Sequence, residues 1–153
     1  MALNSNSSIH FFFENVSPSL KNKKKLKDFI GLLFKKEGKK LSSLNYIFCT
    51  DEALLKVNRQ YLNHDFYTDI ISFDLSDSPN TIIAEVYISV DRVKENARKF
   101  NKSAIEEIHR VIFHGALHFC GYNDKTAGEV KRMRRKEDDL LSNYFRSNGI
   151  VPT

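Results

Sequence analysis

The residues best suited to chemistry lie together in the stretch from His114 to Asp124. Residues four apart on a helix share a face, so His114 and His118 can direct two imidazoles toward one point. Gly121 can end that helix in the left-handed conformation, which lets the chain turn back and present Asp124 to the same point. Three such ligands leave one position open for water, as in a catalytic zinc site. The spacing therefore predicts that Zn²⁺, or another divalent transition metal, binds His114, His118 and Asp124.

The residue after the first histidine limits the reaction. The spacing matches the end of the H-E-x-x-H-x-x-G-x-x-H zinc motif, in which a glutamate after the first histidine is the general base of a protease. Here that position is Gly115, so peptide hydrolysis by this route is not expected. Two histidines on an apolar helix can also arise by chance, but the glycine and the third ligand favour a metal site. His109 has no such partners and is expected to be structural or solvent-facing.

The elements that must position these residues follow from the apolar patterns. Strands are expected at Ile9–Phe13, Leu44–Cys49, Asp69–Leu75 and Ile82–Val90, which are rich in β-branched and aromatic residues. Helices are expected from Ser17-Pro18, from Thr50 to before Asn63, from Asp91, from a capping box at Ser103, and from a second box at Thr126 to about Phe145. The resulting order, β-α-β-α-β-β-α-α-α, predicts an α+β fold in which about five helices cover one four-stranded sheet.

Size and composition indicate a single domain over residues 1–153. The hydrophobic fraction is 41% and the charged fraction 28%, as in ordinary globular proteins. No apolar run approaches the roughly 20 residues that span a bilayer, so no membrane association is expected. Cys49 and Cys120 lie in apolar sequence and are interpreted as buried thiols of a cytoplasmic protein.

Basic residues are concentrated in three runs, 21–27, 35–40 and 131–136, and the formal net charge is +5. Such runs are often only the solvated faces of helices. They also attract polyphosphates without regard to sequence, which makes a nucleic acid a candidate partner.

The block from His114 to Asp124 resembles the H-G-x-L-H-L-x-G-Y-D-H signature of the YbeY endoribonucleases, also called rRNA maturation factors. Thr68–Phe73 is similar to that family's T-D-V-L-S-F element, and Leu54–Leu62 resembles the preceding helix. The resemblance, which extends to about Leu141, implies a mixed four-stranded sheet with a zincin-like metal-binding helix. It also implies bound zinc and cleavage of single-stranded RNA in 16S rRNA maturation and ribosome quality control. The implied partners are the 16S rRNA precursor and the small ribosomal subunit.

Three departures from the family pattern concern the site. The third ligand, usually histidine, is Asp124 here, and carboxylate oxygen is an acceptable zinc ligand. The family's arginine after the tyrosine of the preceding helix is replaced by Leu62, and Arg59, one turn earlier, is a candidate substitute. The usual proline before Thr-Asp is Tyr67. Asp69 in this motif is a candidate hydrogen-bond partner for a ligand histidine, or alternatively a polar strand cap.

The expected reaction is metal-assisted cleavage of a phosphodiester, in which the ion acidifies a bound water and polarises an oxygen of the substrate. The sequence leaves open whether that water or the RNA 2′-hydroxyl attacks. Two other functions remain as alternatives. One is a non-catalytic RNA-binding ribosome-assembly factor with a structural zinc, and the other is hydrolysis of another small phosphoester or amide.

Overall fold

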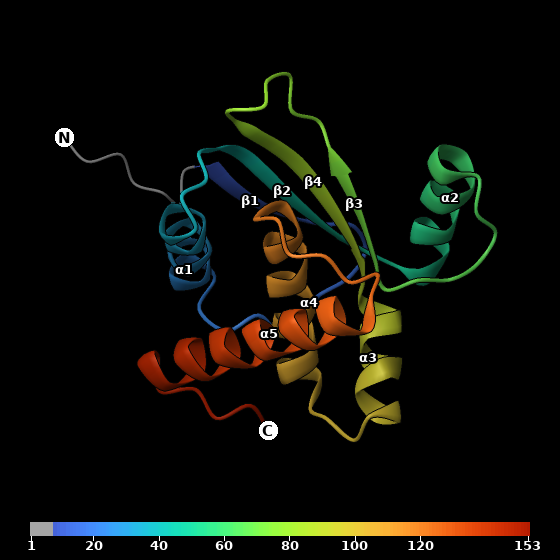
Figure 1. Cartoon of the computed structure of the whole chain (residues 1–153). Helices are drawn as coiled ribbons and strands as arrows, with labels where there is room; N and C mark the ends of the chain where they lie inside the picture. Colours follow the sequence, from blue (N-terminus) through green and yellow to red (C-terminus); the bar gives the residue numbers. More distant parts are fainter. Residues whose placement is uncertain (1–7) are drawn as a thin grey trace.

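The computed structural model describes residues 8–153 (Figure 1). Its elements in chain order are β1 (Ile9–Phe13), α1 (Lys23–Lys36), β2 (Leu41–Cys49), α2 (Asp51–Leu62), β3 (Ile70–Asp74), β4 (Ile82–Ser89), α3 (Val90–Lys99), α4 (Ala104–Phe119) and α5 (Ala127–Ser147). This is the order that the sequence predicts. Over the described residues, no helix combines the length and the apolar character needed to cross a membrane.

The four strands form one mixed sheet in the order β1-β2-β4-β3. β1, β2 and β4 are parallel, and β3 runs antiparallel to β4 at one edge. The fold is therefore α+β with a mixed four-stranded sheet and five helices among the described residues, as expected.

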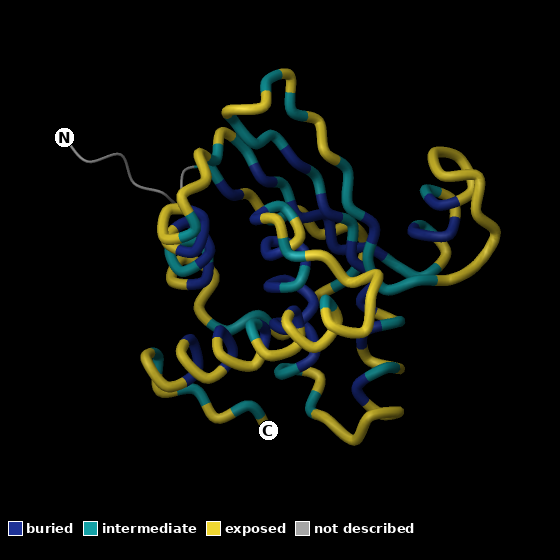
Figure 2. The backbone as a smooth tube through the Cα atoms, viewed as in Figure 1, coloured by how far each residue is buried: buried dark blue, intermediate teal, exposed yellow. Residues whose placement is uncertain are grey.

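The main core lies between the sheet and the helices α1, α4 and α5. Alternate residues of β2 and β4, such as Tyr46 and Val86, point into it and are fully buried. The Tyr46 hydroxyl donates a 2.8 Å hydrogen bond to the Ile112 carbonyl, which joins α4 to the sheet. Figure 2 shows that α4 is buried over most of its length, whereas the outer side of α5 is exposed. α4 is thus the central helix, and it carries both predicted histidine ligands.

The predicted start of the first helix at Ser17-Pro18 is wrong, because α1 begins at Lys23. Asn22 caps it, and its side chain accepts a 3.3 Å hydrogen bond from the Lys25 amide. The segment before it is held by distant partners. The Lys21 amide donates to His109 on α4, and the Lys21 carbonyl accepts from a hydroxyl on α5. These tertiary contacts outweigh the local preference of proline for a first helical turn.

The two predicted capping boxes have different outcomes. At α5, Thr126 and Glu129 form the complete reciprocal box. At α4, Ser103 accepts from the Glu106 amide at 3.0 Å, but the Glu106 side chain lies near Lys102 instead, at 3.9 Å. The capping oxygen is therefore correct at both helices, while the returning carboxylate is present only at α5.

Candidate active site

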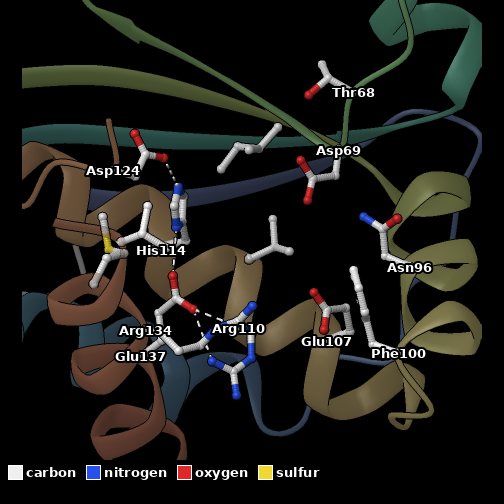
Figure 3. Close-up of a pocket in the computed structure, with 14 residues that line it drawn as sticks. Thr68, Asp69, Asn96, Phe100, Glu107, Arg110, His114, Asp124, Arg134 and Glu137 are labelled. Atoms are coloured by element: carbon white, nitrogen blue, oxygen red, sulfur yellow. Dashed lines mark hydrogen bonds and ion pairs between the residues drawn. The ribbon is translucent and has the colours of Figure 1, made fainter. Parts of the chain in front are cut away.

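A cleft of about 500 Å³ opens where the start of β3 meets α3, α4 and α5 (Figure 3). Asp69 lines it from the segment before β3, Phe100 from the end of α3, His114 from α4, and Glu137 from α5. Asp124, from the turn between α4 and α5, also lines it. Residues far apart in sequence thus meet at one end of the sheet.

His114 is held between two carboxylates. Its Nδ1 lies 2.7 Å from Oε2 of Glu137, and its Nε2 lies 3.3 Å from Oδ2 of Asp124. A carboxylate can only accept a hydrogen bond, so Nδ1 carries a hydrogen and donates it to Glu137. Burial lowers the pKa of His114, but the hydrogen bond to Glu137 and the nearby negative charges outweigh burial and raise it above its usual value. Glu137 of α5 therefore fixes the orientation of the His114 imidazole.

Glu137 is itself fixed by Arg110 of α4. Arg110 donates to Oε1 of Glu137 at 3.0 Å and to Asp138 at 2.7 Å. The Arg110 and Glu137 side chains are only 10% and 6% exposed. A buried charge pair with several hydrogen bonds holds its members in place. The chain Arg110–Glu137–His114 is therefore a preorganised part of the cleft.

Sequence reasoning missed Glu137 and Arg110, although a signal for both exists. The buried stripe of α5 consists of residues at helical spacing, Met133, Glu137, Leu140, Leu141 and Tyr144. A charged residue on such a stripe must find a buried partner. Arg110 likewise lies on the buried side of α4.

Asp69 lies in the cleft, as its candidate role requires, but its relation to the histidine differs from the expectation. The Nδ1 hydrogen of His114 is bonded to Glu137 rather than to Asp69. Burial raises the pKa of Asp69, and its backbone carbonyl accepts from the Ser89 amide at 2.9 Å. Asp69 therefore supplies a second, separately held carboxyl group to the cleft.

Arg59 is not brought to the cleft. It lies on α2, where it forms an ion pair with Asp65, and the two side chains are 55% and 76% exposed. It is absent from the residues that line the cleft. Its proposed substitution for the family arginine therefore has no support from the geometry and stays a prediction.

The predicted metal ligands converge only in part. In the part of the chain that the structure describes, no three His, Cys, Asp or Glu side chains gather closely enough to hold one. Two of the predicted ligands do converge, since Nε2 of His114 faces Asp124. With Nδ1 donating to Glu137, a proton on Nε2 or a cation beside it would satisfy the Asp124 carboxylate that Nε2 faces. His118 lies one turn further along α4 and is exposed. Imidazole nitrogen and carboxylate oxygen are donors that zinc accepts, and of the three predicted ligands only His114 and Asp124 lie together in the described structure.

The fold and the cleft define an α+β protein with a histidine–carboxylate site at one end of a mixed sheet. The family model described as Endoribonuclease YbeY matches residues 12–145. A relative with that name from Cytophaga hutchinsonii is 46% identical over 134 residues, which cover 88% of this chain and 94% of the relative. The corresponding protein of Christiangramia forsetii is also 46% identical over 134 residues, with 88% and 92% covered.

Among solved structures, the solution structure of TM1509 from Thermotoga maritima is similar, with a TM-score of 0.62 and 27% identity. The match covers 91% of this chain and 90% of that chain. This chain therefore belongs to the YbeY endoribonuclease family.

Proposed function

We propose that this protein is a metal-dependent endoribonuclease that cuts single-stranded RNA during 16S rRNA maturation on the small ribosomal subunit, and that the cleft is its active site. Family membership supports the endoribonuclease activity. The observation that carries the site is His114, whose Nδ1 hydrogen bond to buried Glu137 leaves Nε2 directed at Asp124. Histidines that bind metals typically donate their other ring N–H to a carboxylate in this way.

His114, His118 and Asp124 would hold the ion, with Zn²⁺ as the first candidate for nitrogen and oxygen donors. A divalent ion there supplies Lewis acidity to the phosphodiester and an acidified water. Glu137 keeps the His114 tautomer that can bind it, and Arg110 holds the Glu137 side chain in place by donating to its Oε1.

Proton transfer in the cleft falls to the carboxyl groups whose pKa burial raises, Asp69 and Glu107. A carboxyl with a raised pKa can hold and release a proton nearer neutral pH than an exposed one. Asp69 lies directly before β3 and lines the cleft, so we propose it as the first candidate for the proton carrier, with Glu107 as the second.

Metal analysis of three variants tests the site. His114→Ala and His118→Ala should each lose stoichiometric metal and RNA cleavage, because two ligands hold zinc poorly. Asp124→His should retain both. His10→Ala, an exposed histidine of β1, is the matched control and should keep full metal content. Full occupancy in both alanine variants would rule out the site. Loss of metal without loss of cleavage would indicate a structural zinc.

Salt dependence tests the nucleic-acid partner. Lys131, Arg132, Arg134 and Arg135 are exposed on α5, and Arg134 also lines the cleft. Neutralising these four residues should reduce the slope of log affinity against log salt by roughly 0.7 for each phosphate that the variant no longer neutralises. Neutralising four lysines of α1, at positions 23, 24, 25 and 27, changes the charge equally but outside the cleft and should leave the slope unchanged. Equal slopes for all three proteins would mean that α5 does not contact RNA.

A further inference from the structure

An exposed aromatic ring stands in the cleft on the side away from the proposed metal ligands. Phe100, the residue that ends α3, lines the cleft although it is 56% exposed. Asn96, one turn earlier on α3, lines it too. Figure 3 shows Phe100 and Asn96 on the side of the cleft opposite His114 and Asp124. The ring therefore faces the space that a substrate would occupy rather than the core.

A second exposed ring lies along the same side. Tyr67 directly precedes Thr68, which lines the cleft, and the guanidinium of Arg92 lies over the Tyr67 ring at 5.1 Å from its centre. Arg92 is four residues before Asn96 and so shares its side of α3. At 1.5 Å per residue, Arg92 and Phe100 are about 12 Å apart along the helix. Phe100 at the end of α3 thus lines the cleft, and the Tyr67 ring lies beside the neighbouring Thr68, against Arg92 of the same helix.

The backbone that carries Tyr67 is held in place. Buried Asn58 donates a 2.9 Å hydrogen bond to the Phe66 carbonyl, and the Tyr67 hydroxyl donates to Glu52 at 2.7 Å. Arg92 in turn is paired with Asp51 at 2.7 Å. These contacts order the segment, and Arg92 covers one face of the Tyr67 ring while the residue stays 45% exposed.

The opposite side of the cleft carries one exposed cation, Arg134 of α5, which lines the cleft and is 60% exposed, whereas Arg110 is buried and paired with Glu137. The exposed lysine and arginines of α5 continue this charge outward. Rings on one side and cations on the other form the arrangement in which proteins bind single strands, because bases stack on rings while phosphates face the charges.

We infer that unpaired bases of the RNA stack on Phe100 and on Tyr67, while the backbone passes along the α5 side toward His114. This rests on the proposed function and extends it by assigning the side of the cleft that receives the bases. It also gives a physical origin for single-strand preference. In a duplex both faces of each base are covered by neighbouring bases, so no face is available to Phe100.

Binding without cleavage tests the inference. The affinity of the full chain for a short fluorescent single-stranded RNA is measured by anisotropy in a chelator, so that no cut is needed. Phe100→Ala should raise Kd about 5- to 150-fold, the range expected for loss of one stacked base. Phe100→Trp should restore binding. Phe12→Ala is the matched control, since Phe12 is 48% exposed but lies on β1 outside the cleft, and its Kd should not change.

A second comparison uses Tyr67 and the RNA itself. Tyr67→Ala should weaken binding, whereas Tyr67→Phe, which keeps the ring and removes the bond to Glu52, should not. RNA with abasic sites should bind the wild type and Phe100→Ala equally. A 2-aminopurine base in the intact strand should be quenched by the wild type and less so by Phe100→Ala.

The outcomes distinguish failure of the base-stacking inference from failure of the proposed nuclease function. If the wild type binds and cleaves single-stranded RNA but Phe100→Ala binds equally well, the stacking surface is wrong and the nuclease stands. If the wild type neither binds nor cleaves, both fail. If Phe100 instead contacts a second copy of the chain, sedimentation will show that the wild type self-associates and Phe100→Ala does not, at unchanged RNA affinity, and the inference is overturned.

Discussion

Two arginines that could serve the active site, Arg110 and Arg59, differ in burial. Arg110, on α4, is buried and bonded to Glu137 and Asp138. Arg59, on α2, forms a single ion pair with Asp65 in solvent. The first belongs to the α4–α5 side of the cleft, and the second to a helix that stands apart from it (Figure 1).

This difference shows which side of the cleft has side chains held in one conformation. A buried ion pair forces its partners into one arrangement, because any unpaired charge inside the protein is costly. An exposed pair can open into water at little cost. The α4–α5 side is therefore able to orient a reacting group, while exposed residues such as Phe100 and Arg134 can adapt to a flexible strand.

The largest expected effect is the loss of stability when each of the two arginines is removed. Arg110→Ala leaves Glu137 buried without its partner and should lower the free energy of unfolding by about 3–5 kcal/mol. Arg59→Ala removes an exposed pair and should lower it by about 0–1 kcal/mol. Urea unfolding of both variants measures the difference. Similar losses in the two variants would mean that the α4–α5 pair is more hydrated than its burial indicates.

A smaller effect separates orientation from stability. Glu137→Gln keeps the shape of the side chain but weakens its hold on the His114 N–H. Loss of such a supporting carboxylate typically lowers metal affinity about 10- to 100-fold. Competition with a chromophoric chelator measures this without any RNA. Asp138→Asn, at the other partner of Arg110, is the control and should bind metal normally, because Asp138 makes no contact with His114 in the described structure.

The same contrast explains how much the sequence could predict. Local signals were sufficient for the element order, for the Thr50 and Thr126 caps, and for the placement of His114 and Asp124. Each depends on residues a few positions apart. They failed at Ser17-Pro18, where contacts with α4 and α5 decide the conformation.

The buried pair could not be predicted for the same reason. Arg110 and Glu137 are 27 positions apart, and their meeting depends on how α4 and α5 pack. Sequence could flag each as a charge on an apolar stripe, but it could not pair them. Arg59 was chosen for its distance from Leu62 along one helix, and that distance says nothing about whether α2 faces the cleft.

Burial of His109 should also make the stability of the protein depend on pH. Burial lowers the pKa of His109, which accepts from the Lys21 amide and bonds to the Ile105 carbonyl. A lowered pKa means that its contribution to stability is present above about pH 6.5, its unfolded value, and is lost as pH falls through that value toward the folded pKa. The slope from one proton is at most about 1.4 kcal/mol per pH unit.

The measurement is the difference in unfolding free energy between wild type and His109→Gln from pH 7.5 to 5. The difference isolates His109 from Asp69 and Glu107, whose raised pKa values act in the opposite direction. It should shrink as pH falls. A flat difference for His109→Gln would show that burial of His109 does not affect its titration.

The smallest effect concerns two glycines of the same kind of element. Gly115 lies in α4 against the sheet, where an added Cβ would stand 3.2 Å from Ile70 Cδ1 and from Val86 Cγ1. Gly128 lies in the first turn of α5, where an added Cβ meets nothing within 4 Å. The small residue that excludes a protease-type base therefore serves the close packing of α4 on β3 and β4, since its missing side chain would point at the sheet.

Alanine in place of either glycine should gain up to about 1 kcal/mol from helix propensity. Gly128→Ala should show a stabilisation of that sign. At Gly115 the Ile70 and Val86 side chains must shift, so Gly115→Ala should be less stable than Gly128→Ala by a few tenths to about 1 kcal/mol. Thermal unfolding of the two variants beside the wild type gives the comparison. Equal stabilisation by both would show that a methyl group fits between α4 and the sheet. Close packing would then not explain why residue 115 is glycine.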